Sequence, residues 1–284
     1  MKTTVLACID GSTYSPAVCD YAAWAALRLD APLTFLRVMN KVRDDRLTDL
    51  SGSIGFGAQE ALLEEMASLD EQRGKLAQEQ GRQMLSAAKA RARAAGVTEP
   101  EGRQRHGELV DTLIELEAGI RLLVLGKRGS SAEIAAEHLG SHLERVIRAM
   151  HRPILVTTAT FRTPQRIMLA FDGSATTRKG VEMVAASPMF KGLPCHLVMV
   201  GADTVDARAH LAHARQTLED AGFAAPAVIL AGEVEQVLTA YQQKEEIDLM
   251  IMGAYGHSRI RQLLIGSTTT AMIRNSSVPL LLLR

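Results

Sequence analysis

Cysteine is scarce in this chain, and its spacing argues against a disulfide framework or a zinc site. The 284 residues include three cysteines, Cys8, Cys19 and Cys195, an odd number without metal-ligand spacing. We expect small, buried, reduced side chains of a protein in a reducing compartment. Two pairs of histidines, 138/142 and 210/213, have helix-face spacing but no nearby third ligand, so surface positions are favoured and no metal site is predicted.

The chain also lacks an excess of charge of one sign, and it lacks long apolar runs. Lysine and arginine total 32, as do aspartate and glutamate, so no electrostatic argument favours nucleic acid or an anionic membrane as a partner. The first apolar run is interrupted by Asp10, and no later run reaches the roughly 18 apolar residues of a membrane-spanning helix. A hydrophobic content of 47% argues against disorder. We expect a cytoplasmic protein.

Familiar catalytic motifs are also missing. The sequence has no Gly-x4-Gly-Lys-Ser/Thr loop and no Gly-x-Gly-x2-Gly after its first predicted strand, which argues against a standard NTPase and a dinucleotide oxidoreductase. No Ser/His/Asp or Cys/His set is recognisable, and no catalytic residue is assigned.

What the chain does contain is an internal repeat. Residues 5–12 (VLACIDGS) recur as 167–174 (IMLAFDGS), each a predicted strand that ends in Asp-Gly-Ser. Residues 33–38 recur as 196–200, residues 107–108 as 232–233, and residues 122–126 (LLVLG) as 249–253 (LMIMG). Residues 145–156 likewise match 271–282. The two halves therefore represent one fold, duplicated.

The alternation of elements predicts the fold class. Each half has the pattern β-α-β-α-β-α-β-α-β, with helices such as 15–29 and 176–189 between short apolar strands. This pattern indicates an α/β protein with two tandem, doubly wound, five-stranded parallel sheets covered on both faces. We expect domains at 1–158 and 165–284, with the boundary near 159–164.

The two halves differ in length because the first contains one long insertion. The first half uses residues 39–95 where the second needs only 201–221. Residues 44–57 are predicted to be loop, and residues 59–94 one long charged helix or two. The insertion is either a solvated lid or partner surface, or a tolerated surface extension.

The last 38 residues, 247–284, carry the most specific pattern. Predicted strands at 248–252 and 278–283 enclose Gly253-x2-Gly256-x9-Gly266-Ser267. Gly256 can take a positive φ in the turn. A helix that opens at 266–268 directs its unpaired amides, its dipole and two hydroxyls at one place, which can hold phosphate. The alternative is a tight strand-to-helix turn with an ordinary N-cap.

This glycine pattern and its flanking strands resemble the nucleotide-binding end of the universal stress protein family, in its ATP-binding branch. The resemblance implies a Rossmann-like fold, related to adenine nucleotide alpha hydrolases, that binds ATP with or without Mg²⁺. It places the ribose or adenine beside Asp172 and Gly173, the adenine at the backbone of Val200, and the phosphates at Gly253, Gly256, Gly266, Ser267 and Thr268. Asp172 can instead be an Asx-turn residue that shapes its own loop. Arg259 and Arg261 either reach phosphate or stay solvated.

The first half departs from this pattern. Its return loop is one residue longer, Gly126-x2-Gly129-x10-Gly140-Ser141, and His142 replaces a hydroxyl residue. Lys127 and Arg128 either compensate electrostatically or are solvated. We therefore expect a weaker or altered site formed by Asp10, Val38, Gly126, Gly129, Gly140 and Ser141.

Three functions compete. The first is a nucleotide-binding stress-response or signalling module, the second a slow ATP-hydrolysing enzyme, and the third a nucleotide-free interaction scaffold. Asp172 is the one carboxylate assigned near the glycine loop, whereas phosphoryl chemistry usually needs a metal carboxylate and a residue that orients the nucleophile, so binding is favoured. We also expect the edge strands 154–156 and 280–283 to pair as an intramolecular pseudo-dimer. A homodimer would then use another surface.

Overall fold

The computed structural model describes residues 3–39, 56–129, 141–254 and 266–283, with the backbone alone for residues 56–64 and Ser141. Strands and helices alternate through both halves. The first half comprises β1 (Thr4–Cys8), α1 (Ser15–Leu29), β2 (Leu33–Met39), α2 (Phe56–Ala94), β3 (Glu101–His106), α3 (Leu109–Leu116), η1 (Glu117–Gly119), β4 (Ile120–Gly126), α4 (Ser141–Ala149) and β5 (Ile154–Thr157). The second comprises β6 (Ile167–Ala170), α5 (Ala175–Ala186), η2 (Pro188–Phe190), β7 (Cys195–Val200), α6 (Val205–Asp220), β8 (Ala227–Leu230), α7 (Val234–Lys244), β9 (Leu249–Gly253), α8 (Ser267–Asn275) and β10 (Leu280–Leu283).

The described strands form one ten-stranded sheet in the order β3-β2-β1-β4-β5-β10-β9-β6-β7-β8. Within each half every pairing is parallel, and the chain winds outward from the middle in both directions. This arrangement confirms the predicted α/β, doubly wound fold. The winding reverses between β1 and β4 in the first half and between β6 and β9 in the second, which is where such sheets hold ligands.

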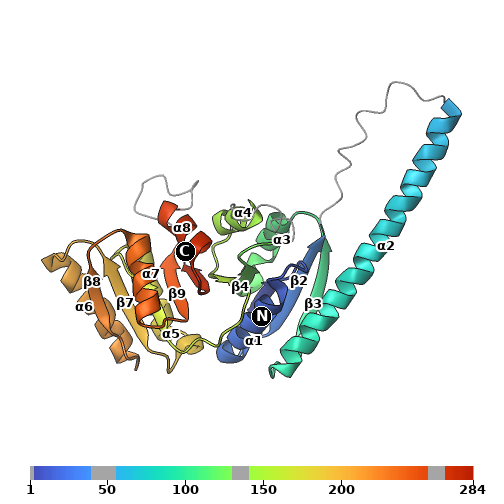
Figure 1. The fold of residues 1–284 in the computed structure, drawn as a ribbon. Coiled ribbons are helices and arrows are strands. Elements are labelled where there is room, and N and C mark those ends of the chain that lie inside the picture. The colour runs from blue at the N-terminus through green and yellow to red at the C-terminus, as the bar shows by residue number, and fades with distance from the viewer. Residues whose placement is uncertain (1–2, 40–55, 130–140, 255–265, 284) are drawn as a thin grey trace.

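The two halves join through their last strands. β5 and β10 pair antiparallel, with Leu281 opposite Leu155 and Leu280 opposite Val156. Leu281 and Leu283 are almost fully buried. The predicted docking of the two terminal strands is confirmed, and Figure 1 shows the two halves side by side with the C-terminus between them.

The core lies on both faces of the sheet because successive strand residues point to opposite sides. In β1, Val5 belongs to the cluster under α1, α2, α5 and α6, whereas Leu6 belongs to the cluster under α3, α4, α7 and α8. This explains the continuous apolar runs seen in the sequence, since both faces of a parallel strand are covered.

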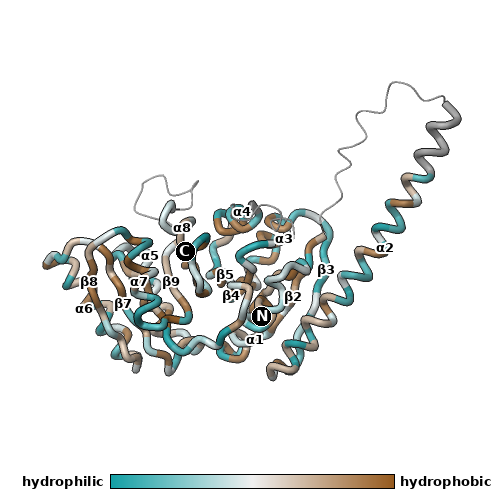
Figure 2. The backbone as a smooth tube through the Cα atoms, in the orientation of Figure 1, coloured by the Kyte–Doolittle hydropathy of each residue, from teal (hydrophilic) through white to brown (hydrophobic). Residues whose placement is uncertain are grey.

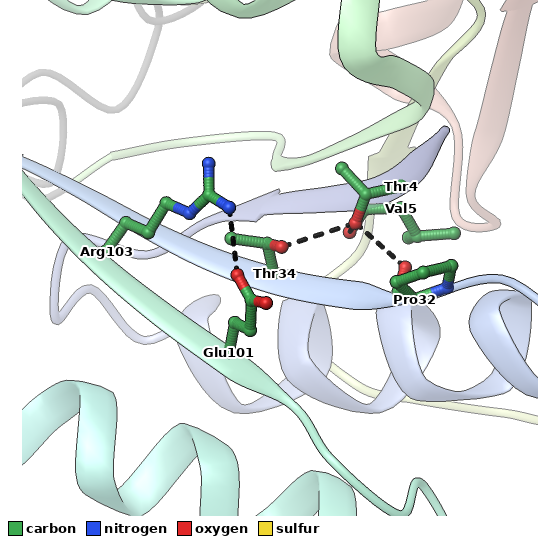
Figure 3. A network of polar contacts seen from close by, with 6 residues as sticks. All are labelled: Thr4, Val5, Pro32, Thr34, Glu101 and Arg103. Atoms are coloured by element: carbon green, nitrogen blue, oxygen red, sulfur yellow. Dashed lines mark hydrogen bonds and ion pairs between the residues drawn. The ribbon is translucent and has the colours of Figure 1, made fainter. Parts of the chain in front are cut away.

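Polar contacts hold the amino-terminal ends of the strands in the first half. The hydroxyl of Thr4 donates to the carbonyl of Pro32 at 2.8 Å and lies 3.3 Å from the hydroxyl of Thr34, while Arg103 and Glu101 pair along β3 at 2.9 Å (Figure 3). These contacts fix the strand starts. The opposite, carboxyl edge carries the loops that the sequence singles out.

The described part of the insertion folds as a single helix of 39 residues, α2, rather than two. The predicted loop over 44–57 is wrong at its end, because Phe56 and Gly57 already belong to α2, and the preceding residues lie outside the described range. The last turns of α2 correspond to α6, since Met84 lies against Gly11 as His210 lies against Gly173. The additional residues therefore precede these turns. Among the described residues, no helix combines the length and apolar character that a membrane crossing requires.

Candidate functional site

Three of the predicted strand ends come together in the second half. β6 lies between β7 and β9 and runs parallel to both. Val200 at the end of β7, the loop 172–174 after β6, and Gly253 at the end of β9 therefore share the carboxyl edge of the sheet. This is the edge at which a doubly wound sheet binds ligands.

Asp172 shapes the loop that follows β6. Its Oδ1 accepts hydrogen bonds from the backbone N–H of Ser174 at 2.9 Å and from the hydroxyl of Thr177 at 2.7 Å. Gly173 has φ +73°, a conformation that favours glycine. Ser174 then caps α5 by accepting from the N–H of Thr177 at 3.2 Å. The Asx-turn role left open by the sequence is thus observed, and the ribose contact stays a prediction.

The helix α8 begins at Ser267, as the glycine pattern predicts, with Gly266 as its N-cap residue. Its first helical hydrogen bond runs from the N–H of Thr270 to the carbonyl of Gly266. Among the described residues no side chain caps this end. The backbone N–H groups of Ser267, Thr268 and Thr269 therefore come before the first helical donor. They form the positive end of the helix dipole, which favours an anion.

A side chain that sequence reasoning missed ties α8 to the sheet. The hydroxyl of the buried Thr269 donates to the carbonyl of Gly253 at 3.1 Å. This bond fixes the start of the helix against the end of β9. Gly256, Arg259 and Arg261 lie outside the described residues.

The first half repeats the loop geometry around Asp10. Its Oδ1 accepts from the N–H of Ser12 at 3.0 Å and from the hydroxyl of Ser15 at 3.3 Å. Gly11 has φ +79°. The last described residue before the gap, Gly129, approaches so closely that a Cβ there would lie 2.8 Å from Oδ2 of Asp10. The carboxyl edge of the first half therefore carries Asp10, Gly129 and the half-buried Val38 near the end of β2.

Two residues at that edge differ from their counterparts in the second half. Leu143, which is 5% exposed, stands where α8 has Thr269, so the hydroxyl that binds the strand end is lost. Tyr14 stands where the second half has Thr176, and a Cβ on Gly126 would lie 2.8 Å from Cβ of Tyr14. Tyr14 therefore packs directly against the end of β4.

The remaining predicted residues of the first half are placed only in part. Ser141 is the first residue of α4, as predicted, while Gly140 lies outside the described residues. The buried Nδ1 of His142, which replaces Thr268, has no hydrogen-bond partner within the described residues.

Lys127 points to the other half instead of to a phosphate site. Its ammonium donates to the carbonyl of Ser276, the C-cap residue of α8, at 3.2 Å. A cation is favourable at the negative end of a helix dipole. Burial lowers the pKa of Lys127, and the charge of Arg128 adds to that effect. This contact between halves could not be expected from sequence spacing.

The three cysteines are free thiols. Burial raises the pKa of Cys8, Cys19 and Cys195 to about 12 in each case, so they are poor nucleophiles. Within the described ranges no group of three His, Cys, Asp or Glu side chains could hold a metal ion.

Comparison with known proteins identifies the family to which this chain is similar. A model described as the universal stress protein family matches residues 1–158 and 198–284. The universal stress protein Slr1230 of Synechocystis sp. is 38% identical over 285 residues, which cover 99% of this chain and 99% of that protein.

Solved structures agree in fold. A universal stress protein from Archaeoglobus fulgidus superposes with a TM-score of 0.71 at 21% identity, covering 99% of this chain and 98% of that chain. A second protein from that organism, solved in complex with dAMP, covers 44% of this chain and 100% of its own at 16% identity and a TM-score of 0.34. The first likeness shows the fold alone, and the second is too weak to assign a ligand here.

Proposed function

Because this chain belongs to the universal stress protein family, we propose that it binds an adenine nucleotide, ATP first of all, chiefly in its second half. In this proposal residues 1–158 and 165–284 are the two domains, and the protein acts in the cytoplasm as a stress-response or signalling module. ATP would lie between the loop 172–174 and the start of α8.

The observation that carries the proposal is the attachment of α8 to the end of β9. The bond from Thr269 to the carbonyl of Gly253 holds the helix start at the edge where the winding reverses. No described side chain caps that start, so its amides are available to a phosphate. The loop fixed by Asp172 lies on the neighbouring strand, β6, within reach of the remainder of a nucleotide.

The asymmetry of the proposal rests on the first half. Leu143 cannot make the bond of Thr269, and Tyr14 occupies the end of β4. The threonine that anchors α8 in the second half is thus replaced by an apolar residue, and a small side chain at the strand end by a bulky one. We expect fewer than two equivalent sites per chain.

The test combines two measurements on the purified full chain. Denaturation followed by mass spectrometry of the released small molecules identifies any nucleotide that the protein retains. Titration calorimetry with ATP on nucleotide-free protein then counts the sites. We expect one strong site per chain. Absence of both retained nucleotide and binding heat would refute nucleotide binding, and two sites of matched affinity would refute the asymmetry alone.

A further inference from the structure

The outer part of α2 projects away from the body of the protein (Figure 1). From Leu85 onward its inner face is buried against α1 and the sheet, as shown by Ala88 at 4% and Ala92 at 0% exposure. By contrast, none of the described side chains from Glu65 to Gln80 is buried. Within the described residues, this outer part is therefore not packed into the body of its own chain.

An apolar stripe nevertheless continues along the projecting part. Leu69 is 46% exposed and Leu76 is 70% exposed, and they lie seven residues apart. In the sequence Leu62 extends the same spacing. Figure 2 shows short apolar stretches along the described, otherwise mostly polar part of α2. Leucine at every seventh position is typical of a helix that packs against another helix.

The charges of α2 are divided along its length. Residues 60–71 contain five acidic and no basic side chains, whereas residues 73–93 contain six basic and one acidic side chain. A second copy of this helix in the antiparallel direction would therefore place acidic segments beside basic ones. A parallel copy in register would place like charges together.

The leucines set the register. An antiparallel copy that crosses midway between Leu69 and Leu76 brings each of these leucines level with the other one of the second copy, because both helices rise by about 1.5 Å per residue. The same crossing brings the acidic residues 60–71 level with residues 74–85 of the second copy, which hold two basic side chains and one acidic side chain.

We propose that the projecting part of α2 is a homodimer interface, formed by antiparallel pairing with α2 of a second copy and centred between Leu69 and Leu76. Leu69 and Leu76 form its apolar seam, and the division of charge along α2 fixes its direction. The pairing does not depend on nucleotide binding. It leaves β5 and β10 free to join the two halves within each chain.

The first test is the mass of the full chain in solution. Multi-angle light scattering and sedimentation at about 1 to 100 μM should give a dimer of the 30.7 kDa chain for the parent and a monomer for the double variant Leu69→Asp, Leu76→Asp. Val205→Asp is the matched control, since Val205 is 81% exposed on α6 and should leave the dimer intact. Circular dichroism checks that both variants remain folded. A monomeric parent, or a dimeric double variant, would overturn the proposal.

The second test addresses direction. Changing Glu65→Lys, Asp70→Lys and Glu71→Lys together gives the outer segment a net positive charge like that of the inner segment and should dissociate the dimer. Adding Arg73→Glu, Lys75→Glu and Arg82→Glu gives the inner segment a net negative charge, so opposite charges face each other again and the dimer should be restored. A dimer that ignores both sets of changes uses a different surface, which would also overturn the proposal.

Discussion

At the scale of single residues, the two halves differ in how their last helix, α8 or α4, meets the sheet. The hydroxyl of Thr269 binds the carbonyl of Gly253, whereas Leu143 in the first half can only make apolar contacts. A single neutral hydrogen bond contributes about 0.5 to 1.5 kcal/mol. A difference of this size corresponds to a several-fold change in a binding constant.

We predict that Thr269→Val weakens ATP binding in the second half by about 2- to 10-fold, as expected from the loss of one hydrogen bond. Valine keeps the shape of threonine but cannot donate to Gly253. Titration calorimetry measures the change. Thr217→Val, which removes a hydroxyl bound to the carbonyl of His213 on α6, is the control and should leave the affinity unaltered. An unchanged affinity in Thr269→Val would argue against this anchoring role.

His196 gives a prediction about pH. The residue is 8% exposed, and its Nδ1 lies 2.9 Å from the hydroxyl of Tyr241. Burial lowers the pKa of His196, Glu245 opposes this effect, and Arg166 adds to it. The unfolded chain therefore takes up a proton at higher pH than the folded chain, so stability is present above the unfolded pKa of about 6.5 and falls as the pH drops below it.

The measurement is urea unfolding between about pH 5 and 8, the range around the ordinary histidine pKa. The parent should lose stability toward the acid end, and His196→Phe should show a flatter dependence on pH. His106→Gln is the control, because His106 is exposed on β3. An identical slope in the parent and His196→Phe would show that another group causes the pH dependence.

The residues of the candidate site were only partly predictable. Asp10 and Asp172 could be found because they end matching strands, and the start of α8 because glycine and hydroxyl residues mark it. Thr269, Tyr14 and Lys127 could not, since their roles depend on partners 16, 112 and 149 positions away in the chain. Sequence spacing reports local geometry, whereas these contacts arise only when distant strands are adjacent.

At the scale of elements, the junction of β5 and β10 gives the clearest prediction. Leu281 is 1% exposed and lies opposite Leu155. A lysine there would bury a charge without a partner, which is strongly destabilising. We expect Leu281→Lys to lower the unfolding midpoint in urea markedly and to expand the particle in small-angle scattering. Leu27→Lys, at a site that is 48% exposed on α1, should do neither. A compact, stable Leu281→Lys would mean that other contacts join the halves.

Element order was predictable because apolar runs and helical periods alternate along the chain in both halves. The end of α2 was predicted, but its start and the choice between one helix and two were not, because a charged helix that leaves the protein body carries no continuous buried face to define its start. The correspondence of its last turns with α6 depends on Met84 and His210 meeting equivalent glycines, and these two side chains have nothing in common in sequence.

At the scale of the whole molecule, the sheet is continuous but its halves are not held by backbone pairing alone. Arg28 of α1 donates to the carbonyl of Met189 at 2.9 Å, and Tyr21 packs edge-on against Phe161 with ring centroids 4.7 Å apart. The first contact joins the two halves directly, and the second orders the segment that links them. Both add to the β5–β10 junction.

The antiparallel junction within one chain also has an evolutionary consequence. A symmetric dimer of single-domain chains carries every inherited substitution twice, once on each side of its axis. When both sides are encoded in tandem and joined at β5 and β10, a mutation reaches one side only. Position 14 can become tyrosine while position 176 remains threonine. Selection can then reshape one half while the other keeps its ancestral task.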